Sequence, residues 1–321
     1  VRDPSNGEQS AFFVTESGEI AYWEKSATGA WGNAKLGGSV RSGTSPAATL
    51  EPGTGNQAVY YVNPAGEMAY WAYAEKTGWT NGVLGGSVRS GTSPVAVYDP
   101  AYEVQAVYYV NTSGEVAYWA NPKKTGWISG VLGGSVRAGT SPVLSIDPSA
   151  GIELVYYVTT GGEVDLWFFK TGSWEGTVAG GSVRSGTNPA VAPTFNSSSG
   201  EVIVYFVNPS GEIAFRYFEG GVWHNGLLGG EAEAGTSPAV VSNTETGSQY
   251  LDYVDSSGEI AYKVFEGSWI SGVLGGNVLA GTSPALVRDA SSGDQWLYYL
   301  NEKNDVWSWT SLSAVLANGK L

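Results

Sequence analysis

The side chains that could bind a ligand or take part in a reaction are mainly aromatic. The chain has 13 Trp, 19 Tyr and 9 Phe residues, but a single histidine, His224, and no cysteine. The absence of cysteine excludes disulfide bonds and thiolate chemistry. One histidine without a Gly-x-Ser-x-Gly motif does not indicate a serine-type catalytic triad. Nucleophilic catalysis of the common kinds is therefore not indicated.

Acidic residues outnumber basic ones, 30 against 16, and the formal net charge is −14. Phosphate groups are bound by clustered Lys and Arg, so nucleic acid and anionic membranes are poor partners for this chain. We find no calcium-loop, P-loop or dinucleotide-binding motif, and we expect neither a metal nor a cofactor. Paired carboxylates brought together by the fold would suit glycoside hydrolysis, which stays open as a weaker alternative.

A glutamate follows a glycine at regular intervals of 46 to 49 residues, and Asn304-Asp305 takes the seventh place. These glutamates could contact a ligand. We instead expect each to pair with an arginine that recurs at the same interval. The glutamates are Glu19, Glu67, Glu115, Glu163, Glu212 and Glu259, and the arginines are Arg41, Arg89, Arg137 and Arg184.

The repeat also predicts the elements that position these residues. One copy has strand signals at residues 94–98, 106–110 and 115–119 and near Val131-Leu132, separated by Gly, Pro and Asn turns. Four short strands in about 48 residues are typical of a propeller blade. We therefore predict an all-β, seven-bladed β-propeller of four-stranded blades. It forms a single domain over residues 1–321, with six blades as the alternative.

The two ends of the chain carry separate expectations. The first strand signal, residues 10–14, corresponds to the second strand of a blade, whereas residues 311–317 resemble the first strand of a later copy. We expect the C-terminal segment to supply the inner strand of the first blade and to close the ring. The start at Val1 and sequons at Asn111 and Asn196 favour a protein of the secretory pathway, N-glycosylated at both positions.

The order of a Val-Tyr-Tyr strand, a turn, an Ala-Tyr-Trp strand, a further Trp and a Gly-Gly pair resembles the fungal fucose-specific lectin propellers over most of the chain. The resemblance implies sugar sites between blades. In these sites an Arg and a Glu bind the hydroxyls, and aromatic side chains cover the apolar face of the sugar. The Trp of the motif matches Trp31, Trp79, Trp127, Trp174, Trp223 and Trp269, and the second aromatic residue matches Tyr73, Phe169, Phe218 and Phe265.

The Arg and the Glu of these lectins are missing from every copy. The Arg position holds Ala11, Ala58, Ala106, Leu154, Ile203, Tyr250 and Trp296, and the Glu position holds Tyr22, Tyr70, Tyr118, Leu166, Phe215, Tyr262 and Ser308. A site built to hydrogen-bond a sugar loses most of its discrimination without such groups. We therefore do not expect fucose to be bound in the manner of the family.

The replacements are apolar and predict pockets for a flat hydrophobic ligand. The expected groups are Tyr250, Tyr262, Phe265 and Trp269; Ile203, Phe215, Phe218 and Trp223; and Leu154, Leu166, Phe169 and Trp174. Positions that break the repeat favour one unique site in the second half of the chain, and they are Asp165, Phe168, Lys170, Arg216, Tyr217, Lys263, Trp296, Trp307 and Trp309.

Some propellers of this lectin-like group are hetero-Diels–Alderases that join a tropolone o-quinone methide to a humulene-type sesquiterpene. The resemblance implies such a pericyclase, which needs its two apolar partners to be oriented and no cofactor. The catalytic residues would be Tyr262, Trp296, Trp307 and His224. The substrate contacts would be Tyr250, Phe265, Trp269, Phe215, Phe218, Trp223 and Trp309. The alternative is a secreted glycan-binding lectin with sites between blades and non-standard sugar specificity. The oligomeric state is left open.

Overall fold

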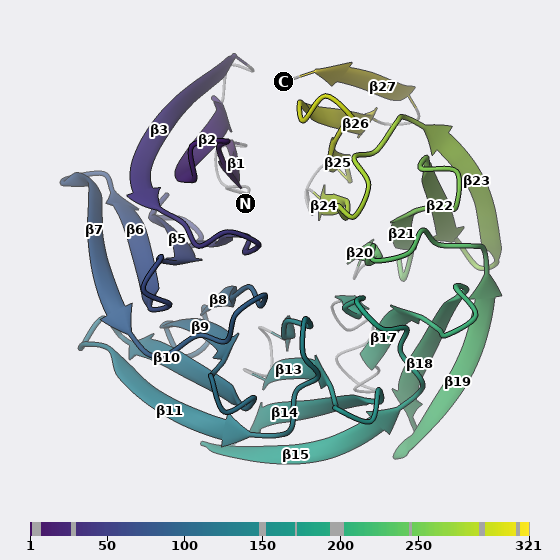
Figure 1. Cartoon of the computed structure of the whole chain (residues 1–321), viewed down its shortest axis with the longest axis horizontal. Coiled ribbons are helices and arrows are strands. Elements are labelled where there is room, and N and C mark those ends of the chain that lie inside the picture. The colour runs from purple at the N-terminus through teal and green to yellow at the C-terminus, as the bar shows by residue number, and fades with distance from the viewer. Residues whose placement is uncertain are drawn as a thin grey trace. The chain divides into compact units, whose positions relative to one another are not determined.

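The computed structural model of the chain describes residues 1, 8–26, 30–147, 152–170, 172–192, 202–243, 246–288, 293–312 and 315–320. The described residues form 27 strands and no helix, in seven antiparallel sheets (Figure 1). Six sheets have four strands and the first has three, and the strands of each sheet are ordered as in the sequence. This confirms the seven-bladed propeller class. We number the sheets as blades 1 to 7 along the chain.

The strands have the following bounds. Blade 1 has β1 (Gln9–Val14), β2 (Glu19–Lys25) and β3 (Trp31–Ser39); blade 2 has β4 (Ala47–Leu50), β5 (Gln57–Val62), β6 (Met68–Ala74) and β7 (Gly78–Gly85); blade 3 has β8 (Val95–Asp99), β9 (Val104–Val110), β10 (Val116–Pro122) and β11 (Ile128–Gly133); blade 4 has β12 (Val143–Asp147), β13 (Ile152–Val158), β14 (Val164–Lys170) and β15 (Ser173–Gly180). Blade 5 has β16 (Ala190–Ala192), β17 (Val202–Val207), β18 (Ile213–Glu219) and β19 (Val222–Gly229); blade 6 has β20 (Ala239–Ser242), β21 (Gln249–Val254), β22 (Ile260–Phe265) and β23 (Trp269–Gly275); blade 7 has β24 (Ala285–Arg288), β25 (Gln295–Leu300), β26 (Val306–Leu312) and β27 (Val315–Lys320).

The chain divides into two compact units. Val1–Thr160 and Trp167–Glu175 form the first, which holds blades 1 to 3, and Gly161–Leu166 and Gly176–Leu321 form the second, which holds blades 5 to 7. A single domain over residues 1–321 stays a prediction. The described part of the chain contains no helix long and apolar enough to cross a membrane.

The second strand of a blade is buried on both faces. All six residues of β5 are buried. Ala58 and Tyr60 pack against Val107 of blade 3, whereas Val59 packs against Ile20 of blade 1. Successive side chains of a strand point to opposite faces. One face of β5 therefore contacts blade 3 and the other contacts blade 1, and this is why the strand is apolar from Ala58 to Val62.

The repeated turn motif, residues 39–46 and its copies, joins neighbouring blades. The Arg41 guanidinium donates to the Val88 carbonyl at 2.9 Å, and Arg89 and Arg184 make the equivalent bonds to Val136 and Ala232 at 2.8 and 3.0 Å. A Ser hydroxyl of each next turn accepts a backbone N–H at 2.8–2.9 Å, from Ser45 to Ser93, from Ser93 to Ser141, from Asn188 to Ser237 and from Ser237 to Ser283. The motif is therefore a structural link between blades.

The predicted pairing of the repeated glutamates with these arginines is wrong for Glu67 and Arg41, for Glu115 and Arg89, and for Glu212 and Arg184. The Glu67 carboxylate accepts from the Asn63 side chain four residues earlier at 3.1 Å, and Asn111–Glu115 and Asn208–Glu212 repeat this bond. The arginine lies instead over the glycine that precedes the glutamate. Gly66 has φ +85°, and a Cβ there would come within 2.3 Å of Arg41 Nη2. Glycine is required at this turn for both reasons.

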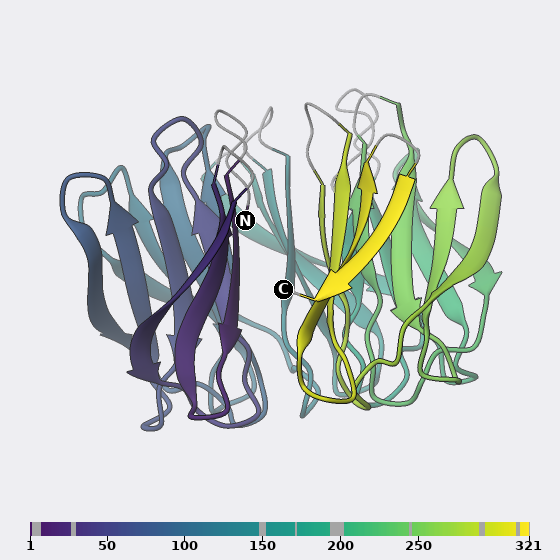
Figure 2. The same cartoon turned by 90° about the horizontal axis from the view of Figure 1, so that it is seen from above.

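The prediction for the C-terminal segment is also wrong. β27 pairs with β26 from Leu312↔Val315 to Trp307↔Lys320, so blade 7 has four strands (Figure 2). Among the described residues, blade 1 has the three strands β1 to β3. Residues 313–314 of the predicted strand lie outside the described residues. A hairpin to the adjacent strand closes a much shorter loop than pairing with the N-terminal strand would, and the entropic cost is correspondingly smaller.

Candidate functional site

The strand register separates the residues of the first predicted aromatic pocket. Tyr262 pairs with Asp252, and Phe265 pairs with Gln249 and with Trp269. Tyr262 and Phe265 are three residues apart on β22, so their side chains lie on opposite faces of blade 6. Tyr250 shares the face of Tyr262, and Trp269 shares that of Phe265. The four residues therefore do not line one pocket, and this grouping is corrected.

The second predicted group is separated in the same way. Phe215 faces Tyr205 with a centroid distance of 5.8 Å, whereas Phe218 pairs across the hairpin with Trp223 at 5.3 Å. Phe215 and Phe218 are three residues apart on β18 and point to opposite faces. Phe215 instead belongs with Trp269 of blade 6, in one packed cluster that includes Ile203.

Triads of aromatic rings fill the contact between neighbouring blades. Tyr60 and Tyr70 of blade 2 lie with ring centroids 6.0 and 6.1 Å from Trp127 of blade 3. Ala58, at the Arg position of the resemblance, is 1% exposed in the same cluster. Equivalent triads are Phe12, Tyr22 and Trp79; Tyr108, Tyr118 and Trp174; and Tyr205, Phe215 and Trp269. Blade packing thus takes the places of the sugar-binding Arg and Glu.

The four predicted catalytic residues do not all lie on one face. Trp307 packs against the cluster formed by Val254 and Ile260 of blade 6 with Leu297 of blade 7, and so does Trp309. Trp296 precedes Leu297 on β25, so its side chain lies on the opposite face, where it is buried.

His224 stacks on Tyr217 at 4.8 Å and lies on the face of blade 5 that carries Phe215. Tyr262 packs over Gly272 on the face of β22 that carries Ile260, and Trp307 packs against Ile260, so Tyr262 and Trp307 face the same contact between blades 6 and 7. The register places Trp296 and His224 on other faces.

Partly exposed aromatic pairs recur at the hairpin between the third and fourth strands. Their ring centroids lie 5.3 or 5.4 Å apart in Tyr73–Trp79, Phe169–Trp174, Phe218–Trp223 and Phe265–Trp269. In blades 2, 5 and 6 the two rings are register partners across the hairpin, which places them on one face. The rings of these pairs are partly exposed, although Trp79, Trp174 and Trp269 also belong to the packed triads.

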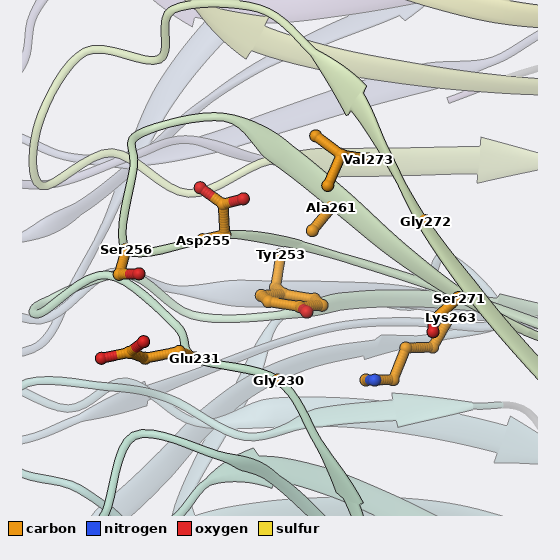
Figure 3. Close-up of a pocket in the computed structure, with 10 residues that line it drawn as sticks. All are labelled: Gly230, Glu231, Tyr253, Asp255, Ser256, Ala261, Lys263, Ser271, Gly272 and Val273. Carbon is orange, nitrogen blue, oxygen red and sulfur yellow. The ribbon is translucent and has the colours of Figure 1, made fainter.

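A pocket of about 380 Å³ lies on the face of blade 6 that carries Phe265 and Trp269. Lys263 is 7% exposed and lines the pocket together with Tyr253 and Ala261. Figure 3 shows Lys263 at one end, Glu231, Asp255 and Ser256 at the other, and the Tyr253 ring between them. Gly230, Ser271, Gly272 and Val273 complete the lining.

The pocket exists because blade 6 has lysine where most blades have tryptophan. The equivalent residues are Trp23, Trp71, Trp119, Trp167, Arg216 and Trp309. A Cβ at Gly85 would lie 3.9 Å from Trp119 Cζ2, and one at Gly133 would lie 3.6 Å from Trp167 Cζ2. A Cβ at Gly86 would lie 3.4 Å from Trp119 Nε1, and one at the equivalent Gly230 would lie 3.4 Å from Lys263 Cε. The lysine stem is narrower than an indole, and the pocket lies beside it.

Among the charged groups of the pocket, Asp255 has hydrogen-bond donors within the described residues, whereas Lys263 has no acceptor there. Burial lowers the pKa of the Lys263 ammonium, and within the described residues no hydrogen bond or ion pair reaches it. Asp255 Oδ1 accepts from the Ser257 N–H at 2.9 Å, the Ser257 hydroxyl at 2.6 Å and the Glu259 N–H at 3.1 Å. Glu231 is exposed. The pocket therefore offers a cation, Lys263, at one end and two carboxylates, Glu231 and Asp255, at the other.

Sequence reasoning identified Lys263 as a break in the repeat but missed the residues that surround it. Glu231 replaces the Ser that begins the turn motif in blades 1 to 4, which is a signal that alignment of the copies could have used. Ser271 and Val273 match residues of the other copies and give no such signal. Their role follows only from the lysine beside them.

The fold and the recurring aromatic pairs define a lectin-like propeller. The family described as fungal fucose-specific lectin matches residues 14–249, and the chain belongs to this family. A comparison with curated proteins gives no match.

Solved structures show the same fold at low sequence identity. The BP39L lectin from Burkholderia pseudomallei is 17% identical with a TM-score of 0.83, covering 100% of this chain and 96% of that one. A variant of the Aleuria aurantia lectin with Fucα1-6GlcNAc is 20% identical with a TM-score of 0.66, covering 85% and 94%. A variant of AofleA from Arthrobotrys oligospora is 15% identical with a TM-score of 0.67, covering 100% and 94%.

Proposed function

We propose that this protein is a glycan-binding lectin whose sites are built on aromatic contact, without the Arg and Glu implied by the resemblance. The observation that carries the proposal is the partly exposed aromatic pair, which recurs in blades 2, 4, 5 and 6 of a chain that belongs to a lectin family. An aromatic face can cover the apolar face of a pyranose, and the edge of the ring stays hydrated. The similar Aleuria aurantia structure that holds Fucα1-6GlcNAc supports a glycan as the ligand class.

Repetition of the pair implies several similar sites on one chain. A single site of this kind, with few fixed hydrogen bonds, discriminates weakly between sugars. Several sites that engage one glycan-covered surface raise the overall affinity through effective concentration. We therefore expect weak binding of monosaccharides and much stronger binding of multivalent glycans.

The hetero-Diels–Alder activity is less well supported by the geometry. It requires two apolar partners held together in one site. The residues of two predicted pockets lie on opposite faces of their blades, and the pocket at Lys263 is lined by charged and hydroxyl groups. We therefore favour glycan binding.

Secretion and N-glycosylation stay predictions. The Asn111 side chain already holds its turn, because Nδ2 donates to Glu115 Oε2 at 3.0 Å and Oδ1 accepts the Glu115 N–H at 2.9 Å. A glycan on Nδ2 would leave one N–H for this bond. Asn196 lies outside the described residues.

A glycan array followed by titration calorimetry with a monovalent hit tests the proposal. Phe265→Ser removes one ring of the blade 6 pair, and we expect it to lower the number of sites per chain by one. Ile270→Ser is the matched control, because Ile270 is 54% exposed on the same hairpin and is not part of the pair. Absence of glycan binding by the wild-type protein, or equal site numbers in the two variants, would refute the proposal.

A further inference from the structure

We infer that the Lys263 pocket is a separate ligand site, specific for a glycan residue that bears a carboxylate, such as a uronic acid. The inference rests on the proposed glycan binding, but it concerns different residues from the aromatic pairs. It also concerns one blade only, because none of the other six copies has lysine at this position.

The Lys263 ammonium at one end of the pocket indicates an anionic ligand group. Lys263 is 7% exposed, and no acceptor among the described residues reaches its ammonium. An ammonium that is partly withdrawn from water favours a nearby group of opposite charge. A ligand carboxylate supplies a charge-assisted hydrogen bond, which is about twice as strong as one to a neutral hydroxyl.

The opposite end of the pocket limits the anion to one charge and calls for hydroxyl groups. Glu231 and Asp255 lie there, across the Tyr253 ring from Lys263 (Figure 3). Carboxylates repel a second negative charge but accept hydrogen bonds from ligand hydroxyls. The hydroxyls of Ser256 and Ser271 can donate or accept beside them. A ring with one carboxylate and several hydroxyls satisfies both ends.

The size of the pocket fits this ligand. Its volume of about 380 Å³ lies at the small end of the range of roughly 300–1,000 Å³ that is usual for ligand sites. Its outer wall is formed by the exposed Val273 and Ser271, so the site is reached from solvent. We therefore expect one sugar ring to enter, with the rest of a glycan outside.

The test compares two ligands that differ only in the carboxylate, methyl β-glucuronide and methyl β-glucoside, by titration calorimetry at low ionic strength. We expect the wild-type protein to prefer the glucuronide by about tenfold, as one added charge-assisted hydrogen bond would give. Lys263→Met should abolish this preference. Lys263→Trp restores the repeat residue, fills the pocket and should abolish it as well. Lys303→Met, which removes an exposed lysine of blade 7, should keep it.

Equal affinity of the wild-type protein for the two sugars, binding of neither, or an unchanged preference in a folded Lys263→Trp variant would overturn the inference. Glycan binding through the aromatic pairs is measured separately by the Phe265→Ser series. Array binding without any uronate preference would therefore refute the site at Lys263 and leave the proposed function standing, whereas loss of all glycan binding would refute both.

Discussion

Glu153 is a buried carboxyl group in the contact between blades 3 and 4, and its replacement by glutamine should change how stability depends on pH. It is 4% exposed, its carboxylate accepts from the Tyr108 hydroxyl, and Asp99 nearby is fully buried. Burial raises the pKa of Glu153, the Tyr108 hydrogen bond lowers it and the Asp99 charge raises it, with a net value of about 7. Ionisation of Glu153 is therefore less favourable in the folded state than in the unfolded chain.

The size of the effect follows from the pKa difference. The pKa of a carboxyl raised from 4.5 to about 7 in the folded protein, at about 1.4 kcal/mol per unit, makes a difference of about 3 kcal/mol. A raised folded-state pKa stabilises the protein fully below the unfolded value, and this stabilisation is lost as the pH rises through about 7. The penalty is therefore small at pH 5 and complete near pH 8.5.

Glu153→Gln removes this titration without removing the hydrogen bond. Glutamine is the repeat residue here, at Gln57, Gln105, Gln249 and Gln295, and the Tyr205 hydroxyl already donates to Gln249 in the equivalent contact. The free energy of unfolding, measured by urea denaturation, should rise in the variant relative to the wild type by about 3 kcal/mol between pH 5 and pH 8.5. Asp252, whose pKa burial also raises to about 7, is present in both proteins and cancels.

Glu75→Gln is the control, because Glu75 lies exposed in the turn between β6 and β7. Its difference from the wild type should not depend on pH over this range. If the wild-type and Glu153→Gln proteins show parallel pH profiles, the carboxyl group of Glu153 is not held neutral by the fold, and the reasoning above is wrong.

Three further predictions follow from the packing, each measured by urea denaturation. Lys263→Trp should stabilise the protein by about 1–2 kcal/mol, since the indole buries apolar surface in the pocket and removes a cation that has no acceptor among the described residues; a loss of stability would contradict this. Arg89→Ala should cost about 1–3 kcal/mol by leaving the Val136 carbonyl without its donor, whereas Arg89→Lys should recover part of it. Gly66→Ala should cost more than about 1 kcal/mol through its φ of +85° and the clash with Arg41, whereas Gly53→Ala, at φ +79° with open space around it, should cost less.

The sequence by itself determined the class of fold. A repeat of 46 to 49 residues, with four strand signals per copy, leaves few architectures other than a propeller, because each copy must bury its apolar strands against its neighbours. Copies of one local pattern also made the Gly-Glu turns, the absent Arg and Glu pair and the exceptional Lys263 visible. These are properties of local geometry and of comparison between copies, which need no tertiary contact.

Only the tertiary structure decided which side chains meet. A side-chain period of two residues places Tyr262 and Phe265 on opposite faces, although the motif makes them neighbours in sequence. Partners come from the next blade, as Trp127 does for Tyr60 and Tyr70, which lie 67 and 57 residues earlier in the chain. The C-terminal strand β27 likewise pairs with the adjacent β26. The pocket at Lys263 is defined by an indole that is missing from a contact between two blades, so it becomes visible only when both sides of that contact are known.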